Sequence, residues 1–111
     1  MKRIENSELN KQNNDMASFN DLGYCTRQES KQFTSANILE VNVATNGYQG
    51  GDSGHGSRTY FSLEDLGSTD MDVRADRGKV EIMLGGDCEL QTFIDALRWA
   101  ADRLEEMSKE G

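Results

Sequence analysis

The stretch Asn37-Ile38-Leu39-Glu40-Val41-Asn42-Val43-Ala44 decides the fold that the sequence predicts. Leu39, Val41 and Val43 alternate with Glu40 and Asn42, so the apolar side chains share one face of an extended chain. A period of two is typical of a strand with one face buried and the other in water. We therefore expect a strand here, on a sheet that needs a cover on one side.

Three later segments show the same alternation. They span residues 58–64, 69–75 and 80–84, with apolar positions at Phe61 and Leu63, then Met71 and Val73, then Val80, Ile82 and Leu84. Asp76-Arg77-Gly78 separates the last two and is typical of a tight hairpin turn. Together the four segments predict a four-stranded antiparallel meander.

A C-terminal helix is predicted to begin at Asp87, a good N-cap residue, with Glu89 in its first turn. Apolar residues then follow at three- and four-residue spacings, and one helix face collects Leu90, Phe93, Ile94, Leu97, Ala101 and Leu104. We expect this face to cover the sheet. The predicted fold class is α+β, with the order ββββα.

Trp99 does not lie on that face. At about 100° per residue it falls on the opposite side of the helix, near Ala96 and Arg103. A tryptophan there needs cover, either from the N-terminal residues or from another subunit, because aromatic residues are enriched in interfaces. We therefore treat Trp99, Ala96 and Arg103 as a candidate interface, and a chain of this size favours a homo-oligomer.

Residues 1–36 are polar and show no sustained period, so we expect a flexible arm followed by a single α+β domain over residues 37–111. This arm is electrically neutral, and the whole net charge of −8 lies in residues 37–111. An acidic body argues against general DNA binding and against binding to anionic membranes. No apolar run is long enough for a signal region or a membrane span, so the expected location is the cytoplasm.

Between the first two predicted strands lies a loop rich in glycine. Glycine lets the chain expose successive N–H groups to an anion, and an arginine and hydroxyl groups at the loop exit add donors suited to phosphate oxygens. Nearby tyrosines could stack on a base. The candidate ligand-binding residues are Tyr48, Gly50, Gly51, Asp52, Ser53, Gly54, His55, Gly56, Ser57, Arg58, Thr59 and Tyr60.

The loop also contains residue types that serve in catalysis and in metal binding. Asp52-Ser53-Gly54 is similar to the nucleophile segment of chymotrypsin-like proteases, but the only histidine follows the serine by two residues and the chain is too short for two barrels. His55 can fix the loop, donate to a ligand or act as an acid or base, and the sequence does not choose among these roles. We expect no bound metal and no cofactor, because Asp52 and His55 alone make a poor ligand set.

The glycine-rich loop, with the flanking Asn42-Val43-Ala44-Thr45-Asn46-Gly47 and Asp65-Leu66-Gly67-Ser68-Thr69-Asp70-Met71, resembles small uncharacterised proteins of bacteriophages and other mobile elements. The resemblance covers about the last two-thirds of the chain. It implies a phage context in a bacterial host and no particular reaction. By analogy it suggests a sponge, a small phage protein that sequesters a signalling nucleotide of antiviral defence.

The function expected from the sequence is binding rather than catalysis. The ligand would be an anionic nucleotide-like molecule, such as a cyclic nucleotide or an ADP-ribose derivative, held by the glycine-rich loop. One alternative is a protein-interaction module that inhibits a host protein through the acidic body and the helix face of Trp99. Another is a small hydrolase that uses His55 and Asp52.

Overall fold

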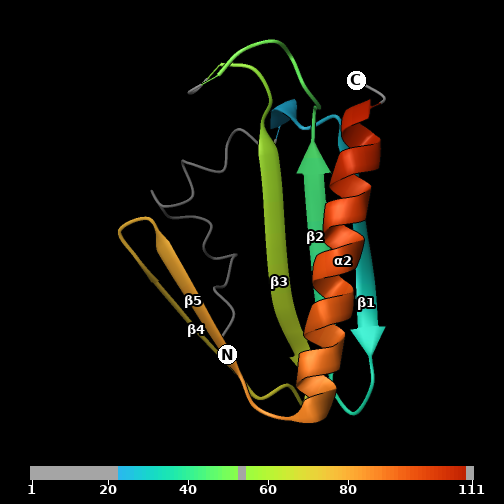
Figure 1. Cartoon of the computed structure of the whole chain (residues 1–111), viewed down its shortest axis with the longest axis vertical. Coiled ribbons are helices and arrows are strands. Elements are labelled where there is room, and N and C mark those ends of the chain that lie inside the picture. Colours follow the sequence, from blue (N-terminus) through green and yellow to red (C-terminus); the bar gives the residue numbers. More distant parts are fainter. Residues whose placement is uncertain (1–22, 53–54, 110–111) are drawn as a thin grey trace.

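The computed structural model describes residues 23–52 and 55–109, which form an α+β arrangement of two antiparallel sheets and a C-terminal helix (Figure 1). The larger sheet has three strands in the order β1-β2-β3, and the smaller is the hairpin β4–β5. In chain order the elements are β1 (Arg27–Thr34), β2 (Ile38–Thr45), β3 (Thr59–Gly67), β4 (Met71–Asp76), β5 (Lys79–Leu84) and α2 (Asp87–Lys109).

β2 is the central strand, and its alternating apolar residues form the centre of the core. Leu39, Val41 and Val43 are fully buried, and Val41 and Val43 pack with small residues of α2. The register of the sheet places Phe61 and Leu63 of β3 beside Val43 and Val41 on the same face. The predicted first two strands are therefore confirmed, with shifts of one to three residues at their ends.

The N-terminal arm was predicted without strands, and the structure differs there. Arg27–Thr34 forms β1, which pairs antiparallel with β2 from Arg27 opposite Thr45 to Thr34 opposite Ile38. The strand escapes a periodicity analysis because it lies at a sheet edge and carries polar residues on both faces, with Phe33 as its one large apolar residue. Residues 1–22 of the predicted arm lie outside the described residues.

The predicted four-stranded meander is wrong, because β4 pairs with β5 and not with β3. A buried polar cluster holds the link between β3 and β4 at one end of the larger sheet. The side-chain amide of Asn37 donates to the hydroxyls of Thr69 (3.2 Å) and Thr92 (2.9 Å), and Thr69 donates to the Ile38 carbonyl at 3.2 Å. From this anchored point the hairpin runs away from β3 (Figure 1).

The predicted hairpin itself is confirmed. Asp76 faces Lys79, so two residues form the turn, and both Arg77 (φ 51°) and Gly78 (φ 82°) have positive φ. Positive φ at both central residues is the geometry of a type I′ turn, which matches the twist of the strands that it joins. The sequence Arg77-Gly78 therefore fixes the register of β4 against β5.

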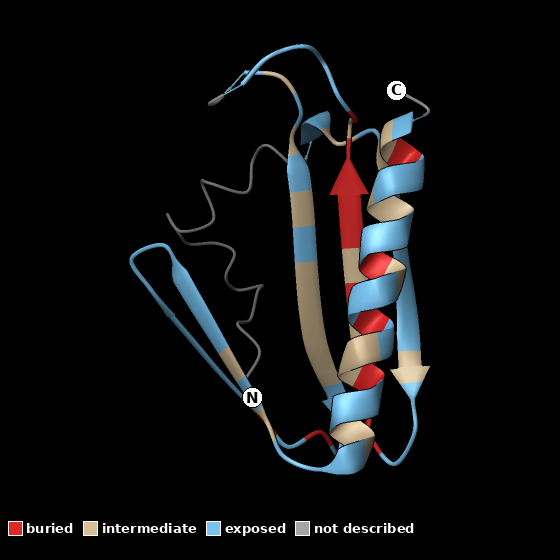
Figure 2. Ribbon diagram, viewed as in Figure 1, coloured by how far each residue is buried: buried red, intermediate tan, exposed pale blue. Residues whose placement is uncertain are grey.

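Helix α2 begins at Asp87 as predicted but packs on the sheet through another face. Its buried residues are Thr92, Ala96, Ala100 and Met107, and the last three cluster with Val41 and Val43 of β2. Figure 2 shows buried segments recurring along the helix. Leu90 and Leu97, expected in the core, remain 56% and 45% exposed. Small side chains let the helix approach β2 closely, which favours this face over the bulkier one.

The structure also places the candidate interface of Trp99, Ala96 and Arg103 inside the chain. The Trp99 ring meets Phe33 of β1 edge to face, with 6.1 Å between centroids and 67° between planes. Arg103 makes two 2.8 Å hydrogen bonds to the Glu29 carboxylate of the same strand. β1 thus supplies the cover that Trp99 needs. Among the described residues, no helix is long and apolar enough to cross a membrane.

Candidate functional site

The glycine-rich loop connects β2 to β3, and Asn46 fixes its base. The Asn46 N–H donates to the Arg58 carbonyl at 3.3 Å, and the Asn46 side-chain oxygen accepts the Arg58 N–H at 2.7 Å. The Asn46 carbonyl accepts from the side chains of Arg27 (3.3 Å) and Gln49 (2.7 Å). Because Asn46 is bonded to Arg58 at the other end of the loop, the pairing of β2 with β3 extends one residue pair into the loop.

Gly51 and Gly56 form a neck where the two sides of the loop come into backbone contact. A Cβ atom on Gly56 would lie 2.5 Å from the Gly51 carbonyl oxygen, and Gly56 also has φ of 92°. Only glycine fits such a close approach at positive φ. Beyond the neck, the His55 N–H donates to the Asp52 carbonyl at 3.1 Å.

The neck carries exposed backbone donors. Within the described residues, the N–H groups of Gly50, Gly51 and Gly56 make no hydrogen bond. Gly50 and Gly51 are exposed, and Gly56 is half-buried. A water-exposed group of N–H donors of this kind suits an anion.

Arg58 lies directly beside this neck. Its Nη1 donates to the carbonyls of Gly56 (3.3 Å) and Ser57 (3.5 Å), both long for a guanidinium. The guanidinium also sits over the ring of Tyr24, 5.9 Å from its centroid. These contacts hold the positive charge of Arg58 next to the glycine N–H groups.

Three residues before β2 support the loop and were missed by the sequence analysis. Tyr24 lies under the Arg58 guanidinium, the Cys25 thiol donates to the Arg58 carbonyl at 3.4 Å, and Arg27 reaches Asn46. They come from the segment predicted as the arm, which carries no motif or period. Only the pairing of β1 with β2 brings them to the loop.

The remaining predicted site residues of the loop are described by how far they are exposed to solvent and by their contacts. Tyr48, Asp52, His55, Ser57 and Thr59 are exposed, and the Thr59 hydroxyl is within hydrogen-bond distance of Thr45 at 3.1 Å. Ser53 and Gly54 lie outside the described residues.

Tyr60 is half-buried on the polar face of the sheet, opposite Ala44. Arg74 belongs to the separate hairpin sheet, so it does not adjoin Tyr60 through strand pairing. The base of the loop thus lies near Tyr24, Tyr48 and Tyr60, and two cations, Arg58 and Arg27, contact it.

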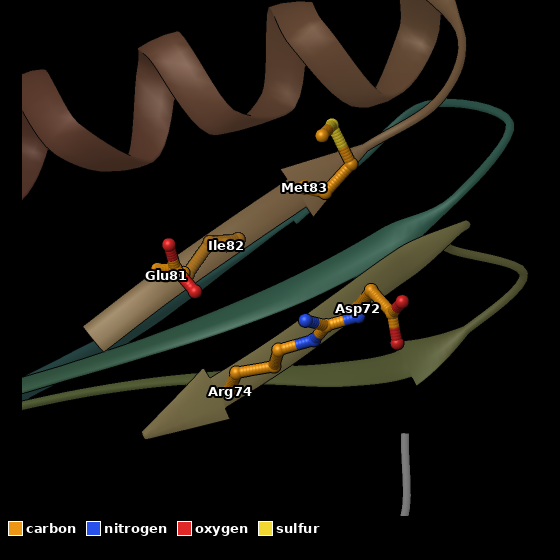
Figure 3. Close-up of a pocket in the computed structure, with 5 residues that line it drawn as sticks. All are labelled: Asp72, Arg74, Glu81, Ile82 and Met83. Atoms are coloured by element: carbon orange, nitrogen blue, oxygen red, sulfur yellow. The ribbon is translucent and has the colours of Figure 1, made fainter. Parts of the chain in front are cut away.

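A hollow of about 510 Å³ lies elsewhere, on the hairpin, and is lined by Asp72, Arg74, Glu81, Ile82 and Met83 (Figure 3). Arg74 faces Glu81 in the hairpin register, so this cation sits opposite a carboxylate. A neighbouring hollow shares Arg74 and Glu81 and extends toward Lys79. The mixed charges of these walls give them no clear preference for an anion.

The loop carries Asp52 and His55, and Cys25 lies at its base. In the part of the chain that the structure describes, no group of three or more His, Cys, Asp or Glu side chains is placed to hold a metal ion. Cys25 and Cys88 are half-buried and are not joined in a disulfide.

Comparisons with known proteins give no match to a family model, to a curated protein or to a solved structure.

Proposed function

We propose that this protein binds an anionic, nucleotide-like small molecule at the neck of the glycine-rich loop. One observation carries the proposal: Gly51 and Gly56 lie in close backbone contact, and the Arg58 guanidinium donates to the Gly56 carbonyl at 3.3 Å, so glycine backbone and a cation meet at the neck. Backbone N–H groups and a guanidinium are the donors that phosphate oxygens accept most readily. A negatively charged ligand at the neck would accept charge-assisted hydrogen bonds from the Arg58 guanidinium.

The tyrosines favour a nucleotide over a bare phosphate. Tyr24 and Tyr48 are largely exposed at the base of the loop. An aromatic ring that faces solvent next to a cation offers a stacking surface for a base. The ligand class is thus an anionic group joined to an aromatic one, which includes cyclic nucleotides and ADP-ribose derivatives.

We further propose that the protein is a binder and not a catalyst, and that it is phage-encoded and works in the cytoplasm of an infected or lysogenic bacterium. The resemblance of the loop and its flanks to small phage proteins supports this context. His55 is exposed, and its backbone N–H donates to the Asp52 carbonyl, a contact that holds the loop. Sequestration of a signalling nucleotide requires no more than binding.

Isothermal titration of the full chain against cyclic dinucleotides, cyclic trinucleotides and ADP-ribose derivatives tests this function. At least one of these ligands is expected to bind, and Arg58→Ala should weaken that binding by roughly 10-fold or more, as expected for loss of a charge-assisted contact. Arg77→Ala is the matched control, because Arg77 is an exposed arginine at the distant hairpin turn. Absence of both heat and thermal shift across the panel would contradict the proposal.

A further inference from the structure

The hairpin β4–β5 has one entirely apolar face. Its register pairs Met71 with Leu84, Val73 with Ile82 and Ala75 with Val80, and these pairs share one side. The other side carries charged residues together with Met83. Although Met71 is buried near the hairpin base, Val80 toward the turn is 66% exposed, and Figure 2 shows most of the hairpin as exposed. An isolated two-stranded hairpin is only marginally stable in water, so this face needs a partner surface.

A second apolar surface lies on the body of the protein. Trp99 and Arg103 turn one side of α2 toward β1, so the side of the helix toward β3 carries Phe93 and Leu97. A helix about 10 Å across covers only two of three strands spaced about 4.8 Å apart. Phe61 of β3 is 44% exposed as a result. We call the apolar residues on this side of α2 the apolar strip, and it consists of Leu90, Phe93, Ile94, Leu97 and Ala101. Phe61 adds exposed apolar area on β3.

The hairpin is anchored so that it points away from the apolar strip of its own chain. The Gly85 N–H donates to the Asp70 carbonyl at 3.0 Å, which ties the two ends of the hairpin together. The Asp70 N–H in turn donates to the Glu89 carboxylate at 3.3 Å, and Thr69 is held by Asn37. The hairpin therefore leaves the body at the N-terminal end of α2 at an angle to β3 (Figure 1).

We propose that a second copy of this chain fills the apolar strip with its hairpin, so that two protomers clasp each other through a two-fold axis. Each chain carries one apolar hairpin face and one apolar strip, so a two-fold symmetric dimer covers all four surfaces at once. The dimensions agree, because six-residue strands are about 20 Å long, and Leu90 to Ala101 spans about 16 Å of helix. Two reciprocal contacts of this kind add up toward the area of a stable dimer.

The charges at the rim also favour a second copy. The hairpin turn presents the exposed side chains of Arg77 and Lys79, which lie 3.9 Å from the Asp76 carboxylate and 3.2 Å from the Glu81 carboxylate. Residues 76–79 hold two basic side chains and one acidic one, so the turn keeps a net charge of +1. Helix α2 is acidic, with six carboxylates and three basic residues, one of which is held by Glu29. Carboxylates lie near both ends of α2, at Asp87 and Glu89 and at Glu105 and Glu106. The turn of a partner hairpin therefore meets negative charge in either direction along the helix.

Mass measurement by light scattering on the ligand-free full chain tests this dimer. The wild type is expected at about twice the chain mass of 12.4 kDa. Val80→Glu and Leu97→Lys should each raise the dimer dissociation constant by roughly 100-fold or more, because each buries an unpaired charge. Met83→Glu is the matched control: Met83 is equally exposed on the same hairpin but on its charged face. It should leave the mass unchanged.

Mixing the two disruptive variants tests which surfaces meet. Val80→Glu with Leu97→Lys should restore the dimer mass, because one contact becomes a Glu–Lys pair and the other keeps the native residues. Far-UV circular dichroism confirms that each variant is folded. A monomeric wild type, an undiminished dimer in either single variant, or no dimer in the mixture would overturn the proposal. A monomer would also be the result if another part of the same chain covered the apolar strip.

Discussion

β2 and β5 carry similar sequence patterns in very different surroundings. Leu39, Val41 and Val43 alternate along β2 and are fully buried, whereas Val80 at the start of an equally regular alternation in β5 is 66% exposed. The difference lies in the neighbours: β2 has strands on both sides and a helix above it, whereas β5 pairs, among the residues that the structure describes, with β4 alone. Alternation therefore shows which residues share a face, and the tertiary structure decides what covers that face.

The largest expected effect comes from placing a charged side chain in the buried strand β2. Val41→Asp places an unpaired carboxylate in the core and should cost more than about 4 kcal/mol of unfolding free energy, which is enough to unfold a small domain. Met83→Asp, on the exposed charged face of the hairpin, should change it by less than about 0.5 kcal/mol. Urea denaturation measures both, and equal losses would remove the distinction between the two sheets.

Asn37 holds the link between the two sheets, and its replacement should have the next largest effect. Asn37→Ala deletes the hydrogen bonds to Thr69 and Thr92, so we expect a loss of about 1–3 kcal/mol. Both threonines still have backbone carbonyls as acceptors, which limits the cost. Urea denaturation measures the loss, and an unchanged midpoint would show that this cluster does not hold the link between β3 and β4.

A smaller effect is expected at the neck of the glycine-rich loop. Gly56→Ala brings a Cβ atom against Gly51 at a positive φ and should cost about 1–3 kcal/mol through local strain. Gly78→Ala is the control, since Gly78 has a similar φ of 82° but nothing within 4 Å of an added Cβ. Thermal melts compare the two variants, and an equal cost would contradict the close contact between Gly51 and Gly56.

The smallest effect concerns the Glu29–Arg103 pair and depends on pH. The hydrogen bonds from Arg103 lower the pKa of Glu29 below its ordinary value of 4.5. The pair therefore stabilises the fold above that value, and its contribution is lost as pH falls through the lowered pKa of the folded state. Because the pair is partly exposed, Glu29→Gln should cost at most about 1 kcal/mol at neutral pH.

Thermal melts of the wild type and Glu29→Gln at a series of pH values measure this dependence. The difference between them should shrink as the solution becomes more acidic than pH 4.5. A difference that stays constant with pH would mean that the ion pair contributes nothing.

Sequence patterns predict this fold well where one side of an element is apolar and the other polar. β2, β3, the β4–β5 hairpin and the start of α2 are all of this kind. β1 is not, since its polar residues reveal their role only beside β2 and Arg103. The pairing of β4 depends on the Asn37–Thr69–Thr92 cluster, whose members are far apart in the sequence.

The prediction of which face of α2 is buried was wrong, because two faces of this helix are apolar enough to pack on the sheet. The bulky face around Leu97 gives the stronger apolar pattern, but the small residues Ala96 and Ala100 allow the closer approach to β2. The loop residues of the candidate site were identifiable from glycine content. The contributions of Tyr24, Cys25 and Arg27 were not, because they depend on the β1–β2 pairing.

Hydrogen–deuterium exchange of the full chain at low and high protein concentration tests most directly whether a second copy covers the apolar face of the β4–β5 hairpin. The amides of β2 should exchange slowly at both concentrations, since their protection comes from within one chain. The amides of β4 and β5 should exchange quickly in dilute protein and become strongly protected in concentrated protein, as association stabilises them. Hairpin exchange that stays fast and independent of concentration would contradict the clasped dimer.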